Sequence, residues 1–366
     1  MSKNRKEIPV TKPFLPPREE YEALINEVWE RNWLTNNGPL VQRLEEELKE
    51  YLGVPHLNYV SNGTIALQIA IKVMELKGEI ITTPFSYVAT TSSIVWEGCK
   101  PVFVDIDPDT LNIDPDLIEE AITDETTGIL ATHVFGNPCD IDAIQEIADR
   151  YNLKVIYDAA HCFGTEYKGE SVYSYGDIST ASFHATKLFH TTEGGAIITN
   201  DAEINHKVQR MRNFGHAGPG NFEGVGINGK NSEFHAAMGI VNLRYIEKVI
   251  ERRKEQWLYY QNLLSGLKIE GLTVSSNVDF NYSYYPAIFE SEKVAINVKD
   301  TLEESGIAPR RYFYPSLSEL GYVDSRKVEV SKDISQRILC LPLYHDLTEE
   351  QQQNIATTIK KTFQFV

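Results

Sequence analysis

Residues 57–83 read LNYVSNGTIALQIAIKVMELKGEIITT and decide the fold class of this chain. The runs at 57–60 and 79–83 each have the length and the β-branched or aromatic content of a strand. The apolar stretch between them, 64–77, has the length of a helix. A strand, a helix and another strand in this order predict a βαβ unit, whose two strands run parallel.

The same alternation continues as far as residue 200. Strands are expected at 57–60, 79–83, 100–106, 128–135, 154–160, 178–185 and 195–200. Helices are expected at 64–77, 87–98, 114–122 and 141–151, with Asp114 as the N-cap and Pro115 at the first position of the third. The strand VIYDAA is nearly all apolar, as expected where helices cover both faces of a sheet. The pattern therefore predicts an α/β large domain with a mostly parallel seven-stranded sheet.

The two ends of the chain differ from this central part. An extended arm is expected at residues 1–20, which contain four prolines, followed by helices at 18–31 and 38–52. After residue 240 the rhythm changes, with a long charged helix expected at 235–265, strands at 282–290 and 337–344, and helices at 294–306 and 348–363. We therefore expect three parts, namely an arm (1–20), a large domain (21–240) and a smaller C-terminal α+β domain (241–366).

The composition excludes several classes of protein. The 35 basic and 52 acidic side chains among 366 residues give a net charge of −17, which argues against a nucleic-acid partner but allows one small anion in a locally basic pocket. The apolar runs are too short to cross a bilayer, and no apolar segment follows the basic residues of the N-terminus, so no membrane association or secretory signal is expected. The four cysteines form no CxxC pair, which argues against a zinc site and favours a reduced, cytoplasmic setting.

Polar residues follow the predicted strands at the edge where α/β sheets bind ligands. After the strand at 57–60 comes SNGT, whose Gly63 and Thr64 open a helix and can expose backbone N–H groups to a phosphate. The alternative is a tight turn with Thr64 as an N-cap. No GxGxxG motif follows any strand, so a dinucleotide site is not expected.

Two ionisable residues stand at the ends of later strands. Asp158 ends the apolar strand at 154–160, where a buried carboxylate needs a cation or hydrogen-bond donors; the alternative is a turn or N-cap residue. Lys187 follows the strand at 178–185, where partial burial can lower the pKa of an amine and make it a nucleophile. The alternative for Lys187 is a solvated loop lysine.

Together these residues match the needs of one cofactor. Pyridoxal 5'-phosphate (PLP) requires donors for its phosphate, a carboxylate for its pyridinium nitrogen and an amine for its aldehyde. SNGT, Asp158 and Lys187 supply these groups from one edge of a sheet. Either Phe85 or Tyr87 can stack on the cofactor ring.

Seven motifs then indicate a family. In order they are SNGTIAL, TPFSYVAT, PVFVDID, DAAHCFG, GDISTASFHATK, EGG and GINGKNSEFHAAMG. By these motifs, and by the arm and RNWLTNNGP (31–39), nearly the whole chain resembles the DegT/DnrJ/EryC1/StrS family of nucleotide-sugar aminotransferases. The resemblance implies the type I PLP-dependent aminotransferase fold, a homodimer with shared active sites, L-glutamate as amino donor and a nucleotide-linked keto-sugar as acceptor.

The resemblance also implies roles for single residues. Lys187 bonds to the cofactor aldehyde and moves protons during catalysis, Asp158 keeps the pyridine nitrogen protonated, and Tyr87 stacks on the ring. The implied phosphate ligands are Gly63, Thr64, Ser182 and, from the partner subunit, Asn228. His161 stands where many members have glutamine near the 3-oxygen of the ring. Related dehydratases have histidine in place of Lys187, so the lysine favours transamination.

The substrate side of the site is less defined by the residues. Lys230, Arg310 and Arg311 are candidates to hold a diphosphate on charge alone, with surface cations as the alternative. His184 is expected near the site without an assigned role, and an ordinary buried histidine is the alternative. Similarity through IPVTKPFLPP, WLTNNGP, NYSYYP and RRYFYP points to dTDP-4-keto-6-deoxy-D-glucose, aminated at C4 for a cell-surface polysaccharide such as a lipopolysaccharide O-antigen. Amination at C3, a UDP- or GDP-linked sugar, a keto-cyclitol and a non-enzymatic regulator are the alternatives.

Overall fold

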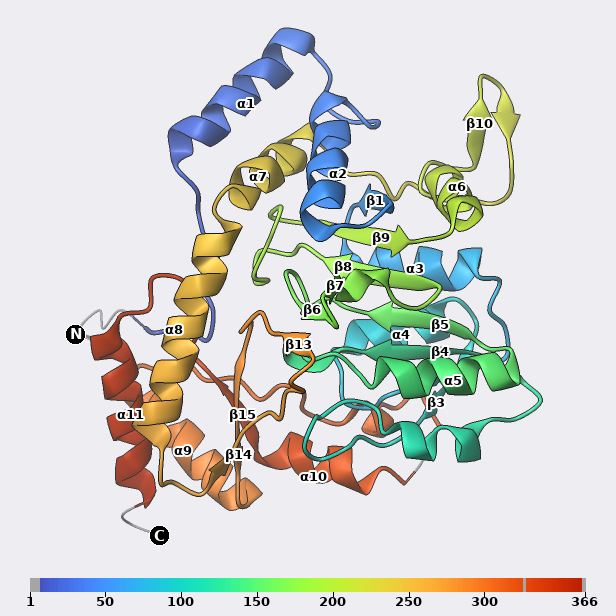
Figure 1. Cartoon of the computed structure of the whole chain (residues 1–366). Coiled ribbons are helices and arrows are strands. Elements are labelled where there is room, and N and C mark those ends of the chain that lie inside the picture. Colours follow the sequence, from blue (N-terminus) through green and yellow to red (C-terminus); the bar gives the residue numbers. More distant parts are fainter. Residues whose placement is uncertain (1–6, 325–326, 364–366) are drawn as a thin grey trace.

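A central sheet with helices on both faces lies beside a smaller sheet in the computed structural model, which describes residues 7–324 and 327–363 (Figure 1). The strand order of the central sheet is β1-β9-β8-β5-β4-β2-β3. Its strands are β1 (His56–Val60), β2 (Glu79–Thr82), β3 (Lys100–Phe103), β4 (Thr126–Thr132), β5 (Lys154–Asp158), β8 (Ile178–Ser182) and β9 (Gly195–Thr199). Only β9 pairs antiparallel with its neighbours in this sheet, so the predicted mostly parallel seven-stranded sheet is confirmed.

Alternate residues of the central strands belong to two different hydrophobic clusters. Ile80 and Ile156 pack in the cluster that includes α3 (Gly63–Val73), whereas Ile81 and Val155 pack in the cluster that includes α5 (Ile141–Tyr151). Because successive side chains of a strand point to opposite faces, each strand needs apolar residues at nearly every position. This explains why the strands read as continuous apolar runs.

Four further helices surround this sheet. They are α1 (Arg18–Arg31), α2 (Pro39–Leu52), α4 (Val88–Trp96) and α6 (Ala202–Met211). The helix α2 packs on α7 (Glu233–Leu243) and is tied to it by Glu233, whose carboxylate accepts hydrogen bonds from the backbone N–H groups of Leu40 (2.8 Å) and Val41 (2.9 Å). A carboxylate at this point satisfies the free donors of the α2 N-terminus.

The single helix predicted at 235–265 is wrong. The chain forms α7 and then α8 (Ile246–Leu264), which are separated by a turn at Arg244 and Tyr245, where the φ of Tyr245 is −110° and its ψ is −2°. The side chains of Arg244 and Tyr245 both contact the carboxylate of Glu20 in α1. These are long-range contacts, which the local sequence pattern does not contain.

The smaller sheet is antiparallel and has the order β12 (Ile269–Glu270), β14 (Tyr285–Phe289), β15 (Ile338–Leu341). It shares a hydrophobic cluster with α9 (Glu292–Glu304) and α11 (Glu349–Phe363), while α10 (Glu329–Arg337) packs on α9. The expected strands and helices of this region are present with shifted ends. The division of the chain into an arm and two domains stays a proposal.

Two other expectations differ from the structure. Residues 114–122 form two short 3₁₀ turns, Pro115–Leu117 and Glu119–Ala121, in place of a helix, because the backbone becomes extended at Ile122 on its way into β4. The capping by Asp114 is present, since its carboxylate accepts a hydrogen bond from the N–H of Asp116 (3.0 Å). No strands were expected at β6 (Glu166–Tyr167), β7 (Glu170–Ser171), β10 (His216–Gly218), β11 (Asn221–Phe222) or β13 (Val278–Asp279). Within the described ranges, every helix is too short or too polar to span a membrane.

Candidate active site

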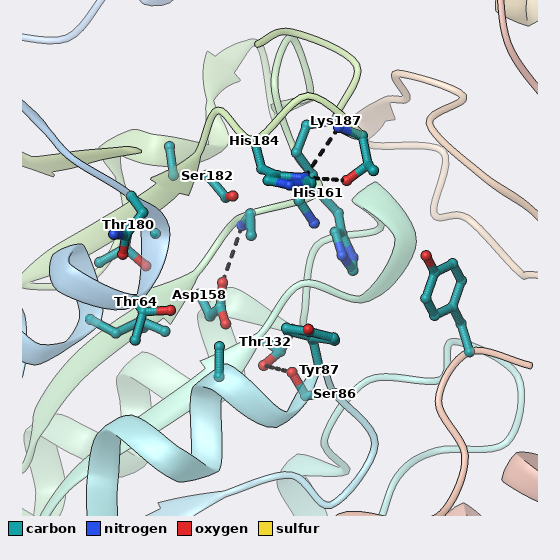
Figure 2. Close-up of a pocket in the computed structure, with 18 of the residues that line it drawn as sticks. Thr64, Ser86, Tyr87, Thr132, Asp158, His161, Thr180, Ser182, His184 and Lys187 are labelled. Atoms are coloured by element: carbon teal, nitrogen blue, oxygen red, sulfur yellow. Dashed lines mark hydrogen bonds between the residues drawn. The ribbon is translucent and has the colours of Figure 1, made fainter. Parts of the chain in front are cut away.

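A cavity of about 300 Å³ opens at the carboxyl ends of β4, β5 and β8. Figure 2 shows side chains from these strands, from α3 and from the loop after β8 reaching into the same space. The predicted residues that line it are Gly63, Thr64, Tyr87, Asp158, His161, Ser182, His184, Lys187 and Arg310. Arg310, Tyr312 and Phe313, which follow α9, close one side of the cavity, so the segment that forms the central sheet and the segment after it both contribute to it.

Lys187 lies in the loop between β8 and β9 with a part-buried side chain. Its backbone N–H donates to the carbonyl of His184 (2.8 Å), which holds it in a tight turn. Desolvation lowers the pKa of the Lys187 amine from 10.5 to about 8, while the negative charge of Asp158 acts in the opposite direction. A large fraction of this amine is therefore neutral, and able to act as a nucleophile or base, slightly above neutral pH.

The lowered pKa of Lys187 predicts a pH-dependent stability. Between pH 8 and pH 10.5 the unfolded chain keeps the Lys187 proton and the folded cofactor-free chain releases it, so stability rises with pH in this window. Relative to Lys187→Met, the wild-type free energy of unfolding should increase by roughly 1–3 kcal/mol across the window. Urea unfolding of both cofactor-free proteins at the two ends of the window measures this difference. A difference that stays flat or falls contradicts the desolvation of this amine.

Asp158 is the last residue of β5 and is buried. Its carboxylate accepts hydrogen bonds from the hydroxyl of Thr90 (2.7 Å) and from the backbone N–H of Ala160 (3.2 Å). Burial raises the pKa of Asp158, and these two bonds and the charge of Lys187 lower it in part. Among the described residues no cation forms an ion pair with it, so the site has an uncompensated acceptor for a protonated ring nitrogen.

A chain of hydroxyl groups supports Asp158 from the sheet and from α4. Thr132 donates to Ser86 (3.1 Å), Ser86 lies 2.7 Å from the hydroxyl of Thr90, and Thr90 donates to Asp158. The sequence reasoning missed these three residues. The sequence feature that could have revealed Ser86 and Thr90 is their spacing of four residues around the start of α4, just after a strand; nothing local marks Thr132.

The N-terminus of α3 faces the cavity and fits a phosphate. A side chain at Gly63 would bring its Cβ to 2.9 Å from the Cβ of Ser182, so glycine lets α3 approach β8 closely. The N-cap is Asn62, whose side chain accepts from the N–H of Ile65 (2.9 Å), so the alternative with Thr64 as the N-cap is wrong. In the described chain neither the Thr64 nor the Ser182 hydroxyl has a hydrogen-bond partner, and both are free to donate to an anion.

His161 presents a neutral imidazole to the cavity. Its Nδ1 accepts a hydrogen bond from the backbone N–H of Phe135 (3.1 Å), so the ring proton is on Nε2. Burial holds the pKa of His161 well below its usual range. The ring is parallel to those of Phe135 and Phe313, which fix its orientation. The imidazole therefore offers one N–H donor, as a glutamine amide would at this place.

Tyr87, and not Phe85, is available to a ligand. Phe85 is fully buried and packs edge-on against Phe135 and Phe313. Tyr87 is 57% exposed and lines the cavity immediately before α4. The burial of Phe85 therefore resolves the choice that the sequence left open.

Of the four remaining candidates, three cationic side chains and one amide, only one lines the cavity. Arg310 lines the cavity, with its guanidinium 5.2 Å from the centre of the Tyr312 ring and no ion pair to a described carboxylate. Arg311 instead donates to Glu292 (3.0 Å) and to the carbonyl of Gln336 (2.7 Å), outside the cavity. Lys230 and Asn228 also lie outside the cavity: Lys230 donates to the side chain of Asn213 (2.7 Å), and Asn228 forms a β-bridge with Asn213.

The chemistry of these groups fits PLP. The amine with a lowered pKa, the buried acceptor, the two unpartnered hydroxyls beside a helix N-terminus and the exposed tyrosine all face one cavity. With the strand order of the central sheet, they define a PLP-dependent aminotransferase of the type I fold.

Comparisons with known proteins agree with this class. The chain belongs to the DegT/DnrJ/EryC1/StrS aminotransferase family, whose model matches residues 17–360. It is 44% identical to the dTDP-4-amino-4,6-dideoxy-D-glucose transaminase of Shigella dysenteriae over 97% of this chain and 99% of that protein. The structure matches DesI, solved in the presence of its TDP-sugar product, with a TM-score of 0.93 and 30% identity over 97% of this chain and 93% of DesI. It also matches the PLP form of the sugar aminotransferase Spr1654 from Streptococcus pneumoniae, with a TM-score of 0.90 and 25% identity over 98% of this chain and 99% of that chain.

Proposed function

We propose that the protein transfers the amino group of L-glutamate to C4 of dTDP-4-keto-6-deoxy-D-glucose. The products are 2-oxoglutarate and dTDP-4-amino-4,6-dideoxy-D-glucose, a precursor for a cell-surface polysaccharide such as a lipopolysaccharide O-antigen. The observation that carries the reaction type is the Lys187 amine, with a pKa of about 8, in one cavity with Asp158. The similarity to the Shigella dysenteriae transaminase supports this choice of sugar.

In the proposed arrangement, each of these residues contacts a different part of the cofactor. When bound, PLP supplies an electron sink that stabilises negative charge on the reacting carbon. Thr64, Ser182 and the N-terminus of α3 at Gly63 hold the phosphate, and the carboxylate of Asp158 holds the proton on the ring nitrogen. Tyr87 covers one face of the ring, and His161 donates its Nε2 proton to an oxygen on the ring.

Lys187 moves the protons in both halves of the reaction. In the first half, the neutral amine of Lys187 removes the proton from the carbon of L-glutamate that bears the nitrogen and delivers this proton to the cofactor. In the second half, the reverse proton movements place the nitrogen on C4 of the sugar. A base with a pKa of about 8 suits both directions, because it holds and releases a proton near the working pH. Water supplies the keto oxygen of 2-oxoglutarate in the first half of the reaction, and the keto oxygen of the sugar leaves as water in the second half, so the overall transfer neither consumes nor forms water.

Arg310 is proposed to bind the anionic part of a substrate, either the carboxylate of L-glutamate or the diphosphate of the sugar nucleotide. Arg310→Ala should raise the KM of one substrate by about 10- to 100-fold, since a charge-assisted hydrogen bond contributes roughly 1.5–3 kcal/mol. Stopped-flow measurement of the two half-reactions shows which substrate is affected. Arg311→Ala is the control, because it removes the bonds to Glu292 and Gln336 and should lower stability without changing either KM. Unchanged KM values for Arg310→Ala in both half-reactions contradict this role.

The active protein is proposed to be a homodimer with shared sites, located in the cytoplasm. Asn228 and Lys230 lie outside the cavity of their own subunit, so a role of Asn228 at the cofactor phosphate, or of Lys230 at the substrate diphosphate, requires a second copy. Large exposed apolar side chains near them, Phe214 (48%), Phe222 (59%) and Val225 (75%), support an interface on this segment. Light scattering of the wild type and of Phe222→Asp tests the association.

The substrate is tested by mass spectrometry of the products formed from L-glutamate and a panel of keto-sugars. The panel contains dTDP-, UDP- and GDP-linked sugars with the keto group at C3 or C4, and a keto-cyclitol. Preferred conversion of the dTDP-linked 4-keto sugar supports the proposal, and preferred conversion of another member replaces it. A purified protein that stays colourless with added PLP and converts none of them favours a non-enzymatic regulator.

A further inference from the structure

The loop that carries Lys187 joins β8 to β9, and most of its backbone hydrogen bonds lie at its two ends. Phe183 donates to Gly194 (2.8 Å), Thr191 to Phe183 (2.9 Å) and Ala185 to Thr192 (2.8 Å), whereas the backbone bond of Lys187 itself runs only to the neighbouring carbonyl of His184 (2.8 Å). Reactive side chains on loops need additional contacts to keep one geometry. The side chains around this turn are therefore the place to look for what positions the amine.

The imidazole of His184 provides such a contact within the turn. Its Nδ1 accepts a hydrogen bond from the backbone N–H of Thr186 (3.2 Å) and lies 2.8 Å from the Thr186 hydroxyl. Because a backbone N–H can only donate, Nδ1 is an acceptor and the proton of the neutral ring is on Nε2. Figure 2 shows the ring of His184 beside Lys187, with dashed lines that end on this turn.

The second ring nitrogen connects the turn to the far end of the loop. The Nε2 atom of His184 lies 3.4 Å from a carboxylate oxygen of Glu193, two residues before β9 begins. The backbone of Glu193 is itself held, because its carbonyl accepts from the hydroxyl of Thr191 (2.8 Å) and from the side chain of Asn231 (2.9 Å). The imidazole therefore connects two parts of the loop. One is the turn that contains Thr186 and Lys187, and the other is Glu193, whose backbone is held by its own hydrogen bonds.

We propose that His184 is a positioning residue that holds Lys187 through Thr186. The Nδ1 atom is the essential one, because its two contacts lie inside the turn next to Lys187, whereas the Nε2 contact is longer and partly exposed. Loss of the Nδ1 acceptor leaves the N–H of Thr186 without its partner and lets the turn take other conformations. An amine misplaced by ~1 Å loses ~10²-fold in rate. This inference rests on the proposed role of Lys187 as the group that moves the protons.

Three variants separate the two ring nitrogens. His184→Asn keeps a hydrogen-bonding atom at the Nδ1 position, His184→Gln keeps one at the Nε2 position, and His184→Ala removes both. We expect His184→Ala to lower kcat by ~10²-fold with little change in the KM for L-glutamate. His184→Asn should restore most of this loss, and His184→Gln should restore little.

A second readout does not depend on turnover. The visible absorbance of PLP bonded to Lys187, followed as a function of pH, reports the environment of that linkage. We expect its titration midpoint to shift in His184→Ala and His184→Gln and to stay near the wild-type value in His184→Asn. Thermal unfolding of the cofactor-free variants separates a misfolded protein from a mispositioned lysine.

The outcomes distinguish this inference from the proposed function. Wild-type turnover and an unshifted titration in His184→Ala overturn the inference, and so does rescue by glutamine without rescue by asparagine. If the wild-type protein aminates no keto-sugar, the proposed function fails, while the absorbance titration still decides the role of His184.

Discussion

Lys187→Ala is expected to lower the rate of amino transfer by ~10⁴-fold or more, because it removes both the nucleophile for the cofactor and the group that moves the protons. The variant should fold, since the Lys187 side chain is only part-buried and its backbone contacts remain available. It should also still bind PLP through Thr64, Ser182 and Asp158. The measurement is product formation together with the absorbance spectrum, in which the band of lysine-bonded PLP should be missing.

Lys187→Arg is the matched control for Lys187→Ala. It keeps a positive charge in the cavity but carries no amine that can bond to an aldehyde or release a proton near neutral pH. Equal loss of activity in both variants assigns the effect to the amine and not to the charge. Turnover within ~10-fold of the wild type in either variant would contradict the mechanism, because that loss is far below what acid–base catalysis contributes.

Asp158→Asn is expected to lower the activity of the enzyme but to raise the stability of the cofactor-free protein. The turnover number should fall by roughly 10²- to 10³-fold, as found when one pre-organised electrostatic partner of a reacting group is removed. Burial raises the pKa of Asp158, so its charge destabilises the folded cofactor-free chain at pH values above the ordinary carboxyl range. The neutral amide removes that penalty, so the cofactor-free variant should unfold at a higher temperature than the wild type near neutral pH.

The sign of this stability change depends on pH. The folded pKa of Asp158 is raised, so the wild-type stability falls as pH rises through it, and the advantage of Asp158→Asn disappears at low pH, where the carboxyl is protonated in both states. Asp109→Asn is the control, because Asp109 is exposed and does not line the cavity. Thermal unfolding with and without PLP at several pH values tests the prediction. A cofactor-free Asp158→Asn that is less stable than the wild type contradicts the view that Asp158 is uncompensated.

The convergence of the candidate site was predictable from the sequence because parallel strands end at one edge of a sheet. Gly63 and Lys187 stand just beyond the end of a predicted strand, Asp158 and Ser182 lie within the last four residues of one, and the structure places all four around one cavity. The residues that support them were not predictable in the same way. The hydroxyl chain to Asp158 uses Thr132 from another strand, and no local pattern specifies such a neighbour.

The two adjacent arginines are a second case in which the sequence alone could not predict which side chain reaches the site. Arg310 and Arg311 are adjacent and identical in the sequence, yet only Arg310 reaches the cavity, because Arg311 is held by Glu292 and by the carbonyl of Gln336. The break between α7 and α8 likewise depends on Glu20, far away in the chain.

The sequence by itself determined the fold class, the seven strands, the cofactor class and the lysine that is the candidate to react with it. Those features follow from local apolar periodicity and from residue types at strand ends, which are short-range properties of the chain. Tertiary structure alone decided that Tyr87 and not Phe85 faces the cavity, and that the Lys187 amine has a lowered pKa. Burial and the direction of a side chain depend on residues far apart in the sequence, so they exist only once the chain has packed.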